Sequence, residues 1–107
     1  MKPLHILIDD VRNLNGMDII IRTPVVALDY VRNNETTGHV LYMDNDLSSN
    51  PKDPEGQHIL RQLLDWGQRP KKVVLVTANP VAAQNMREDL KDLGYKENPN
   101  RIEYDFV

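Results

Sequence analysis

Short apolar runs rich in branched residues alternate along this chain with segments that have helical periodicity. The apolar runs occupy residues 4–9, 19–22, 40–43 and 73–78, and each is largely continuous rather than alternating. Continuous runs of this length are typical of strands that are covered on both faces. Strands that alternate with helices predict an α/β domain with a parallel sheet and right-handed crossover connections.

Three segments between these runs carry the signals of helices. Thr23 is a good N-cap, and Pro24 suits the first helical position, where no N–H is needed. Asn79 and Pro80 repeat this start signal before the last predicted helix. Within residues 57–66, apolar side chains form a single stripe, and a glycine follows as a stop. These signals predict helices after the second, third and fourth apolar runs.

The order of these elements predicts a single domain over residues 1–107 with a three-layer, flavodoxin-like fold. Its sheet is expected to have five strands, mainly parallel. If their order is the flavodoxin-like 2-1-3-4-5, which the family resemblance described below also implies, the first and third strands are neighbours. Residues 101–106 alternate between apolar and polar side chains, which predicts an edge strand with one wet face. The connection at 10–18 is too short for the usual crossover helix, and no helical pattern follows the last strand. We therefore expect the first helix to be reduced and the last helix to be absent.

The composition excludes several kinds of site. The 107 residues include no cysteine, so a disulfide framework, a thiolate metal site and a cysteine nucleophile are impossible. The net charge of −3 offers no broad basic surface for a nucleic acid duplex. There is no signal segment and no apolar stretch of the ~20 residues that a membrane span needs. We therefore expect a soluble cytoplasmic protein that does not associate with membranes.

Acidic residues follow two of the apolar runs that are predicted to be buried. Asp9 and Asp10 end the first run. Asp44 and Asp46 follow the third run and flank Asn45. Ligands of open parallel sheets bind beyond the carboxyl ends of the strands, where the predicted order brings these residues together. Converging carboxylates repel one another unless a cation lies between them, so we predict that Mg²⁺ or Mn²⁺ binds through Asp9, Asp10 and Asp44. The competing interpretation is that these side chains only cap turns and helix starts.

Other polar side chains at the same predicted edge are candidates for contacts with a phosphate. Arg12 and Arg22 would hold phosphate oxygens or would merely balance the aspartates. Thr77 would donate its hydroxyl to a phosphoryl oxygen or would simply end a strand. Asn79 can combine a helix N-cap with ligand binding. His58 lies early in a helix beside a polar loop, where it is either a ligand-binding residue or a surface histidine.

Four short motifs, taken in their order and spacing, resemble a known family. They are IDDVR at 8–12, IIIRT at 19–23, MDNDL at 43–47 and TANP at 77–80. Together they are similar to the cyclic-phosphate-processing receiver-like domains, which are compact relatives of response-regulator receiver domains. The resemblance covers residues 4–95 and implies a receiver-like fold with a reduced first helix. The positions that match the family pattern are Asp9, Asp10, Arg12, Arg22, Thr23, Asp44, Asp46, Leu47, Gly56, Asn79 and Pro80.

The chain departs from this family pattern at two places. The family usually has histidine between the two aspartates, where this chain has Asn45. It usually has histidine and then serine where this chain has Val76 and Thr77. Histidine is the natural acid–base group near neutral pH. The resemblance therefore implies that this chain retains the family's phosphate-binding residues. It also implies that the two histidines that could carry protons during hydrolysis are missing.

The resemblance and the acidic residues together allow three alternative functions. The first is metal-dependent processing of a cyclic or ADP-ribose-type phosphate, with Asp9, Asp10 and Asp44 at the metal and Asp46 as base. The second is a binding module without turnover, which sequesters a phosphate-containing nucleotide or contacts a protein partner. The third is a receiver that accepts a phosphoryl group on Asp44. True receivers have a lysine after the last strand, and residues 101–107 contain none, which disfavours this third alternative.

Overall fold

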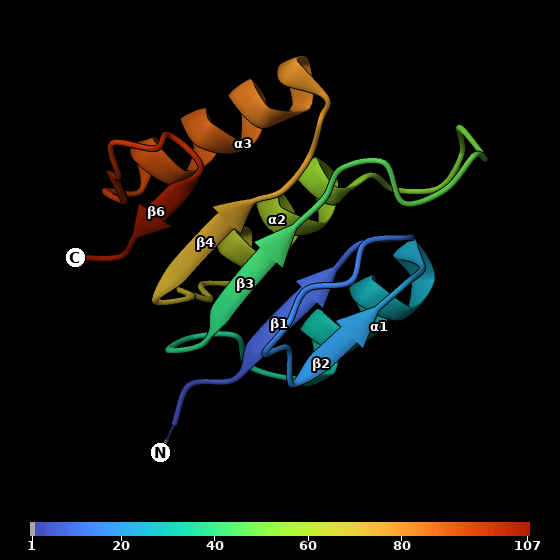
Figure 1. Cartoon of the computed structure of the whole chain (residues 1–107), viewed down its shortest axis with the longest axis horizontal. Helices are drawn as coiled ribbons and strands as arrows, with labels where there is room; N and C mark the ends of the chain where they lie inside the picture. Colours follow the sequence, from blue (N-terminus) through green and yellow to red (C-terminus); the bar gives the residue numbers. More distant parts are fainter. Residues whose placement is uncertain (1) are drawn as a thin grey trace.

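The chain folds around a six-stranded sheet in the computed structural model, which describes residues 2–107 (Figure 1). In chain order the elements are β1 (His5–Ile8), β2 (Ile19–Ile21), α1 (Pro24–Asn33), β3 (Val40–Met43), α2 (Gly56–Asp65), β4 (Lys72–Leu75), α3 (Pro80–Asp92), β5 (Lys96–Glu97) and β6 (Glu103–Asp105). The strand order is β2-β1-β3-β4-β6-β5. The strands β1 to β4 pair in parallel, while β6 runs antiparallel to both β4 and β5. The predicted α/β class is confirmed, with a mixed sheet.

The predicted number and order of the strands are wrong. The prediction of five strands missed β5, whose two residues Lys96 and Glu97 carry no apolar pattern that would mark them as a strand. The strand expected at 101–106 is present as β6, but it is not an edge strand, because β5 pairs with its outer side. Its alternation does reflect one wet face, since Tyr104 is fully buried in the core whereas Glu103 and Asp105 on either side of it are partly exposed.

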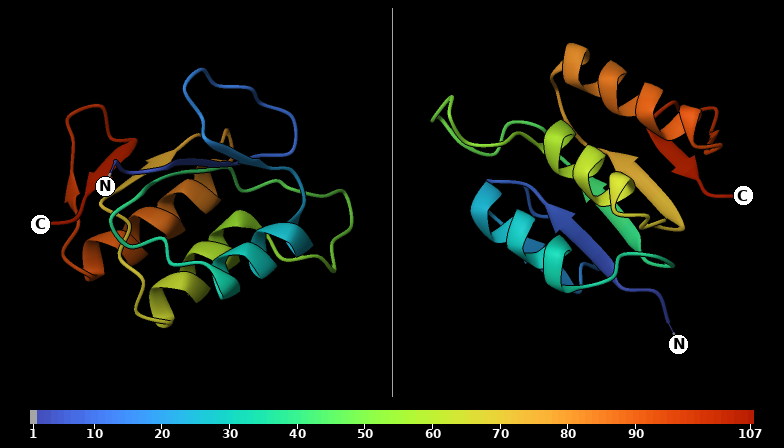
Figure 2. Two further views of the ribbon diagram at one scale, coloured as in Figure 1. Left: turned by 90° about the horizontal axis from the view of Figure 1, so that it is seen from below. Right: turned by 180° about the vertical axis from the view of Figure 1, so that it is seen from behind.

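The helices cover only one face of the sheet, so the predicted three layers are corrected to two. Figure 2 shows α1, α2 and α3 side by side on one face, with the β1–β2 connection on the other. The physical reason is that a receiver-like sheet is covered on its second face by the first and last helices, and neither exists in residues 2–107. The short connection at 10–18 was therefore a better guide to the architecture than the continuous apolar runs.

Polar caps start the helices at the positions that the sequence predicts. The Thr23 hydroxyl accepts a hydrogen bond from the backbone N–H of Val26 at 3.3 Å. The Asn79 side chain accepts one from the N–H of Ala82 at 3.0 Å. Each cap satisfies a backbone donor that has no partner within the helix. Within residues 2–107, no helix is both long enough and apolar enough to cross a bilayer.

A single apolar core lies between the sheet and the three helices. Its fully buried members include Ile6 and Ile8 on β1, Leu41 on β3, and Leu60 and Leu63 on α2. The helix α2 packs between α1 and α3, so its apolar stripe contributes at the centre of the helical layer (Figure 2). Burying a leucine side chain completely contributes roughly 1.5–3 kcal/mol. This core fixes the carboxyl ends of β1 and β3 relative to each other.

Charged side chains make the helix-free face of the sheet compatible with water. Lys72 on β4 forms ion pairs with Glu103 at 2.9 Å and with Asp105 at 3.8 Å on β6. On the neighbouring strands, Nδ1 of His5 and the hydroxyl of Tyr42 are hydrogen-bonded at 3.0 Å. Cross-strand pairs of this kind stabilise a sheet by roughly 0.2–1 kcal/mol each. The face is therefore held by polar contacts instead of by a second helical layer.

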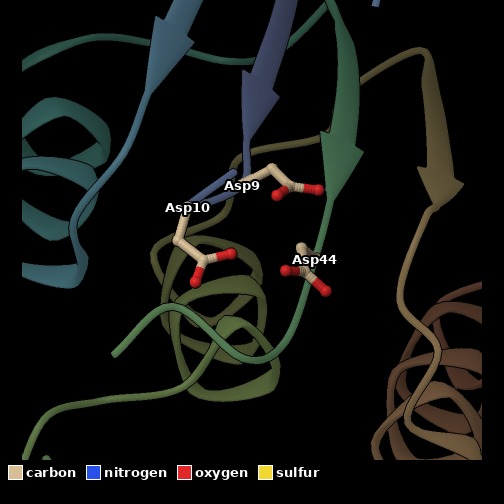
Figure 3. A group of neighbouring side chains, drawn as sticks. All are labelled: Asp9, Asp10 and Asp44. Atoms are coloured by element: carbon tan, nitrogen blue, oxygen red, sulfur yellow. The ribbon is translucent and has the colours of Figure 1, made fainter. Parts of the chain in front are cut away.

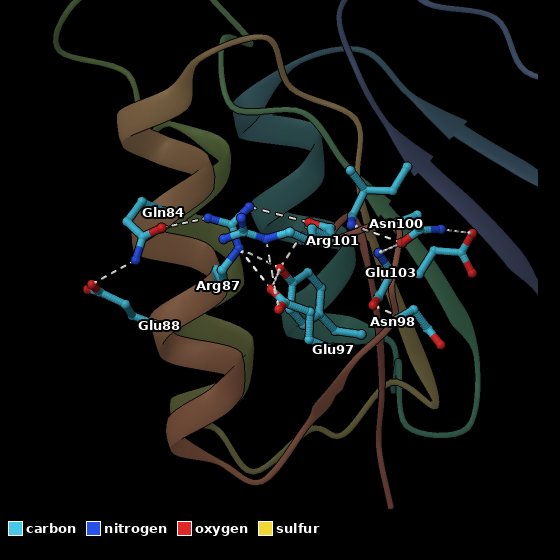
Figure 4. Close-up of polar contacts among 10 residues, drawn as sticks. Gln84, Arg87, Glu88, Glu97, Asn98, Asn100, Arg101 and Glu103 are labelled. Atoms are coloured by element: carbon cyan, nitrogen blue, oxygen red, sulfur yellow. Dashed lines mark hydrogen bonds and ion pairs between the residues drawn. The ribbon is translucent and has the colours of Figure 1, made fainter.

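A polar network attaches the C-terminal hairpin of β5 and β6 to α3 (Figure 4). The hydroxyl of Tyr104 donates to Oε2 of Glu97 at 2.7 Å and accepts from Nε of Arg87 at 2.6 Å. Arg87 also forms an ion pair with Glu97 at 3.2 Å. The hydrogen bond from Tyr104 lowers the pKa of the Glu97 carboxyl, and burial raises the pKa of Tyr104. These contacts explain how so short a strand as β5 is held in the sheet.

Candidate acidic site at the carboxyl ends of the strands

Three carboxylates gather where β1 and β3 end. Asp9 and Asp10 follow β1, and Asp44 follows β3. The strands are in register, with Ile8 opposite Met43, so the residues that follow them emerge at the same level of the sheet. One oxygen from each carboxylate lies within 4.8 Å of the others (Figure 3). The structure thus brings together the three residues that the sequence assigned to a metal site.

Asp9 is the most fully engaged of the three carboxylates. Its Oδ1 atom accepts hydrogen bonds from the backbone N–H groups of Val11 at 3.0 Å and Arg12 at 2.9 Å. Its Oδ2 atom forms an ion pair with the Arg12 guanidinium at 2.9 Å. The residue is completely buried. A buried carboxylate needs such partners, so Asp9 organises the turn after β1 in addition to contributing charge to the cluster.

Asp44 has the strongest electrostatic reason to attract a cation. It is only 9% exposed, and this burial raises the pKa of its carboxyl. The charges of Asp9 and Asp10 raise it further, while the backbone N–H of Asn45, which donates to Asp44 Oδ1 at 2.8 Å, acts in the opposite direction. Three carboxylates at this spacing disfavour full ionisation. A divalent cation would remove that penalty, and carboxylate oxygens are the donors that Mg²⁺ prefers.

The two arginines of the predicted phosphate shell both contact the loop that follows β1. Arg22 donates to the carbonyl oxygens of Arg12 at 2.6 Å and Asp9 at 3.2 Å, and to the side chain of Asn13. Arg12 donates to Asp9 and to the carbonyl oxygen of Val76 at the end of β4. The Arg12 side chain is 40% exposed. Arg22 therefore braces the loop, and Arg12 spans the site from β1 to β4 with part of its guanidinium open to solvent.

Asn45 links the acidic cluster to the start of α2. Its side-chain oxygen accepts from the N–H of Gln57 at 3.1 Å, and its Nδ2 atom donates to Asp46 at 3.1 Å. Its carbonyl oxygen accepts from the N–H of Gly56 at 2.9 Å. Asn45 is completely buried, whereas Asp46 is exposed. The residue that replaces the family's histidine is therefore a structural link that orients Asp46.

Gly56 lies very close to the site, and the sequence did not predict this contact. A Cβ atom at Gly56 would lie 1.8 Å from the carbonyl oxygen of Asp44. Only glycine allows the first turn of α2 to lie directly against the end of β3. The available signal was a glycine at the junction of a polar loop and an amphipathic helix, which also occurs where no close contact exists. The backbone N–H of Gln57 donates to the side-chain oxygen of Asn45, and nothing in the sequence indicated that Gln57 contacts the site.

The remaining predicted residues lie at two different places. The Thr77 hydroxyl interacts with the Asp44 carboxyl and lowers its pKa, although burial has the larger and opposite effect. The Asn79 side chain caps α3. His58 accepts from the N–H of Glu55 at 3.0 Å, as one half of a capping box at the start of α2. The structure therefore places Thr77 at the cluster and commits His58 to a helix cap.

The loop at 47–55 does not fold over the acidic cluster. It projects beyond the carboxyl ends of the strands, as the green segment of Figure 1 shows. Within it, the Ser48 hydroxyl donates to Asp53 at 2.7 Å, and Leu47 is buried against the core. Of the three carboxylates of the cluster, Asp10 is exposed, whereas Asp9 and Asp44 are buried.

Comparison with known protein families gives one match. Residues 4–92 match the cyclic-phosphate processing receiver domain, and this span includes every residue of the acidic cluster. No curated protein and no solved structure matches the chain.

Proposed function

The chain belongs to the cyclic-phosphate processing receiver domain family, and from that premise we propose that it binds and processes a cyclic or ADP-ribose-type phosphate with the help of a divalent metal ion. The observation that carries the proposal is the convergence of Asp9, Asp10 and Asp44, whose oxygens lie within 4.8 Å of one another. Three carboxylates fit a hard divalent cation, Mg²⁺ or Mn²⁺, better than any other common partner.

The three aspartates would have unequal parts in holding the ion. Asp10 is exposed, and Asp44 has a raised pKa that a cation would bring down, so these two would be the principal ligands. Asp9 already accepts three hydrogen bonds and contributes mainly its charge. When bound, the ion would polarise a phosphate oxygen and favour ionisation of a bound water.

The groups that would contact the phosphate lie at the cluster and at the end of β4. Arg12 offers guanidinium N–H donors that are not used by Asp9 or Val76, and charge-assisted bonds of this kind suit phosphate. The Thr77 hydroxyl and the side-chain amide N–H groups of Asn79, whose Oδ1 caps α3, add donors at the end of β4. Arg22 supports this arrangement through the loop that it braces.

Proton transfer is the weakest part of the proposed reaction, and this favours a second candidate function. Asn45 is buried in structural hydrogen bonds, Val76 has no titratable group, and His58 is committed to a cap. Asp46 is the remaining base, because it is exposed beside the cluster. A positioned proton carrier contributes roughly 10² to 10⁴ in rate, so we expect slow turnover. A binding module without turnover, which sequesters the nucleotide or contacts a protein partner, is the second candidate.

Turnover of cyclic phosphates separates these two functions. We expect slow, Mg²⁺-dependent opening of 2′,3′-cyclic nucleotides or ADP-ribose cyclic phosphate, followed by phosphorus NMR or chromatography. Asp46→Asn should reduce the rate by about 10² or more, because it removes the base. His58→Ala should leave the rate nearly unchanged, because that side chain caps α2. Rapid hydrolysis that survives Asp46→Asn would refute this base, and binding without any product would establish the second candidate.

Arg12→Ala is expected to weaken phosphate binding by roughly 1.5–3 kcal/mol, because it removes charged hydrogen bonds. It should also lower stability, since Asp9 would stay buried without its ion-pair partner. Calorimetric titration with the cyclic nucleotide measures the first effect, and thermal unfolding measures the second. Arg61→Ala is the matched control, because Arg61 pairs with Asp89 on α3 instead of with a residue of the acidic cluster. If Arg12→Ala binds the cyclic nucleotide as tightly as the wild type, Arg12 does not contact the phosphate.

A further inference from the structure

A groove of about 320 Å³ runs along α1 and is closed on one side by the end of the loop at 47–55. The residues that line it are Val25, Val26, Leu28, Asp29, Arg32 and Pro54. Five of them belong to α1, and the sixth precedes α2. Its volume is at the lower end of the range for small-molecule pockets, which is roughly 300–1,000 Å³.

The groove lies on the β2 side of the acidic cluster, and no residue of the cluster lines it. The helix α1 starts directly after β2, which is the strand beside β1, so the order along the sheet edge is α1, Asp10 and then Asp44. Arg22, three residues before Val25, donates to the carbonyl oxygens of Asp9 and Arg12. In Figure 3, Asp10 is the member of the cluster on the α1 side. A ligand whose phosphate lies at the cluster can therefore extend into the groove.

The lining combines exposed apolar side chains with two charged side chains, Asp29 and Arg32. Val25 and Val26 are 68% and 54% exposed, which leaves branched apolar surface in contact with water at the start of a helix. Asp29 and Arg32 lie further along the helix, about 6 Å and about 10 Å from Val25 respectively. Flat apolar rings pack on aliphatic surface, a carboxylate accepts from sugar hydroxyls, and a guanidinium stacks on a base.

We infer that this groove along α1 binds the nucleoside part of the phosphate ligand, with the base against Val25, Val26 and Pro54. The inference rests on the proposed function, and it names the substrate class as a nucleotide instead of a small sugar phosphate or inorganic phosphate. Asp29 and Arg32 supply the polar contacts to the ribose or to a second base edge. A protein partner is the poorer fit, because stable protein interfaces bury about 800 Å² on each side.

The chain provides a matched control for testing the groove. Val25 and Val81 both follow a proline at the first position of a helix that starts at the carboxyl edge of the sheet. Their exposed fractions are 68% and 69%, but only Val25 lines the groove. Val25→Gln and Val81→Gln therefore make the same neutral change at equivalent exposed positions, and neither is expected to disturb the fold.

The test is calorimetric titration of both variants and of the wild type, in Mg²⁺, with 2′,3′-cyclic AMP, 2′,3′-cyclic UMP and inorganic phosphate. We expect Val25→Gln to weaken binding of the cyclic nucleotides about tenfold and to leave phosphate binding unchanged, with Val81→Gln like wild type. Equal nucleotide affinity in both variants, or a wild type that binds the nucleotides no better than phosphate, would overturn the inference while leaving the proposed function intact. If the wild type binds none of the probes, the proposed function fails first. Self-association that Val25→Gln abolishes, without an effect on nucleotide binding, would assign the groove to a second copy of the chain and also overturn the inference.

Discussion

Replacing Gly56 with alanine is expected to destabilise the fold by about 3 kcal/mol or more, the upper end of the cost of overpacking. The new methyl group would lie 1.8 Å from the carbonyl oxygen of Asp44 and 2.9 Å from the Cα atom of Asn45. Both neighbours are backbone atoms at the end of β3, so no side chain can rotate to make room. Either α2 must move away from β3, or the residues that carry the acidic cluster must shift. Urea unfolding measures the loss of stability, and the same samples should lose their response to Mg²⁺.

Gly16→Ala is the matched control for this substitution. Gly16 has a φ of +83°, and a Cβ atom there would meet no atom within 4 Å. Its replacement therefore costs only the left-handed backbone conformation, about 1–2 kcal/mol, and leaves the acidic cluster untouched. The φ of Gly56 is not in the left-handed region, so the destabilisation by Gly56→Ala would come only from the steric clash of the new methyl group. If Gly56→Ala costs no more than Gly16→Ala, the close approach of α2 to Asp44 is not present in solution.

Asp44→Asn is expected to abolish the stabilisation that Mg²⁺ gives to the wild type. An ion that binds only the folded state stabilises it by mass action, by about 2.7 kcal/mol when its concentration is 100 times Kd. The variant keeps the shape of the side chain but loses a ligand and one negative charge. Thermal unfolding with and without millimolar Mg²⁺ measures the shift, and Asp65→Asn, which changes an exposed carboxylate on α2, should respond like the wild type. A shift that survives in Asp44→Asn, or is absent from the wild type, contradicts the metal site.

The same substitution has an opposite effect when no metal is present. Because the pKa of Asp44 is raised in the folded state, its protonated form stabilises the fold below the unfolded pKa of about 3.9. That stability is lost as the pH rises through the folded pKa. Asp44→Asn should therefore be more stable than the wild type at pH 7 and should lose this advantage near pH 4. Metal affinity of the wild type should rise over the same interval, because the ion binds the ionised carboxylate.

The sequence was sufficient to predict the position of the three carboxylates, because strand ends are marked by a change from apolar to acidic residues. The assignment of Asp9 and Asp44 to neighbouring strands needed the flavodoxin-like strand order as well, which the alternation of strands and helices allows and the family resemblance implies. The number of layers could not be obtained in the same way. Continuous apolar runs suggest cover on both faces, yet the helix-free face carries the Lys72 ion pairs with Glu103 and Asp105.

The contacts that shape the site were beyond sequence reasoning. Nothing in the order of residues indicates that the Asn45 side chain bonds to Gln57, or that Gly56 touches the end of β3. These contacts depend on where the polar loop at 47–55 returns to the sheet. The sequence of a polar loop has no hydrophobic periodicity, so the conformation of the loop cannot be predicted from it. The short strand β5 was missed for a related reason, since polar contacts with Arg87 and Tyr104 hold it instead of an apolar pattern.

The placement of all three helices on one face of the sheet has a consequence for how the protein unfolds and is degraded. A sheet covered on both faces has two cores, and one can loosen while the other persists. In residues 2–107 the main apolar cluster lies on one face only, and α2 belongs both to it and, through Gly56, to the acidic site. Water that enters between α2 and the sheet would free the carboxylates and open the backbone in one cooperative event. Ligand affinity and resistance to proteases therefore depend on the same unfolding equilibrium. A bound nucleotide would stabilise the folded state and so slow degradation of the protein by proteases.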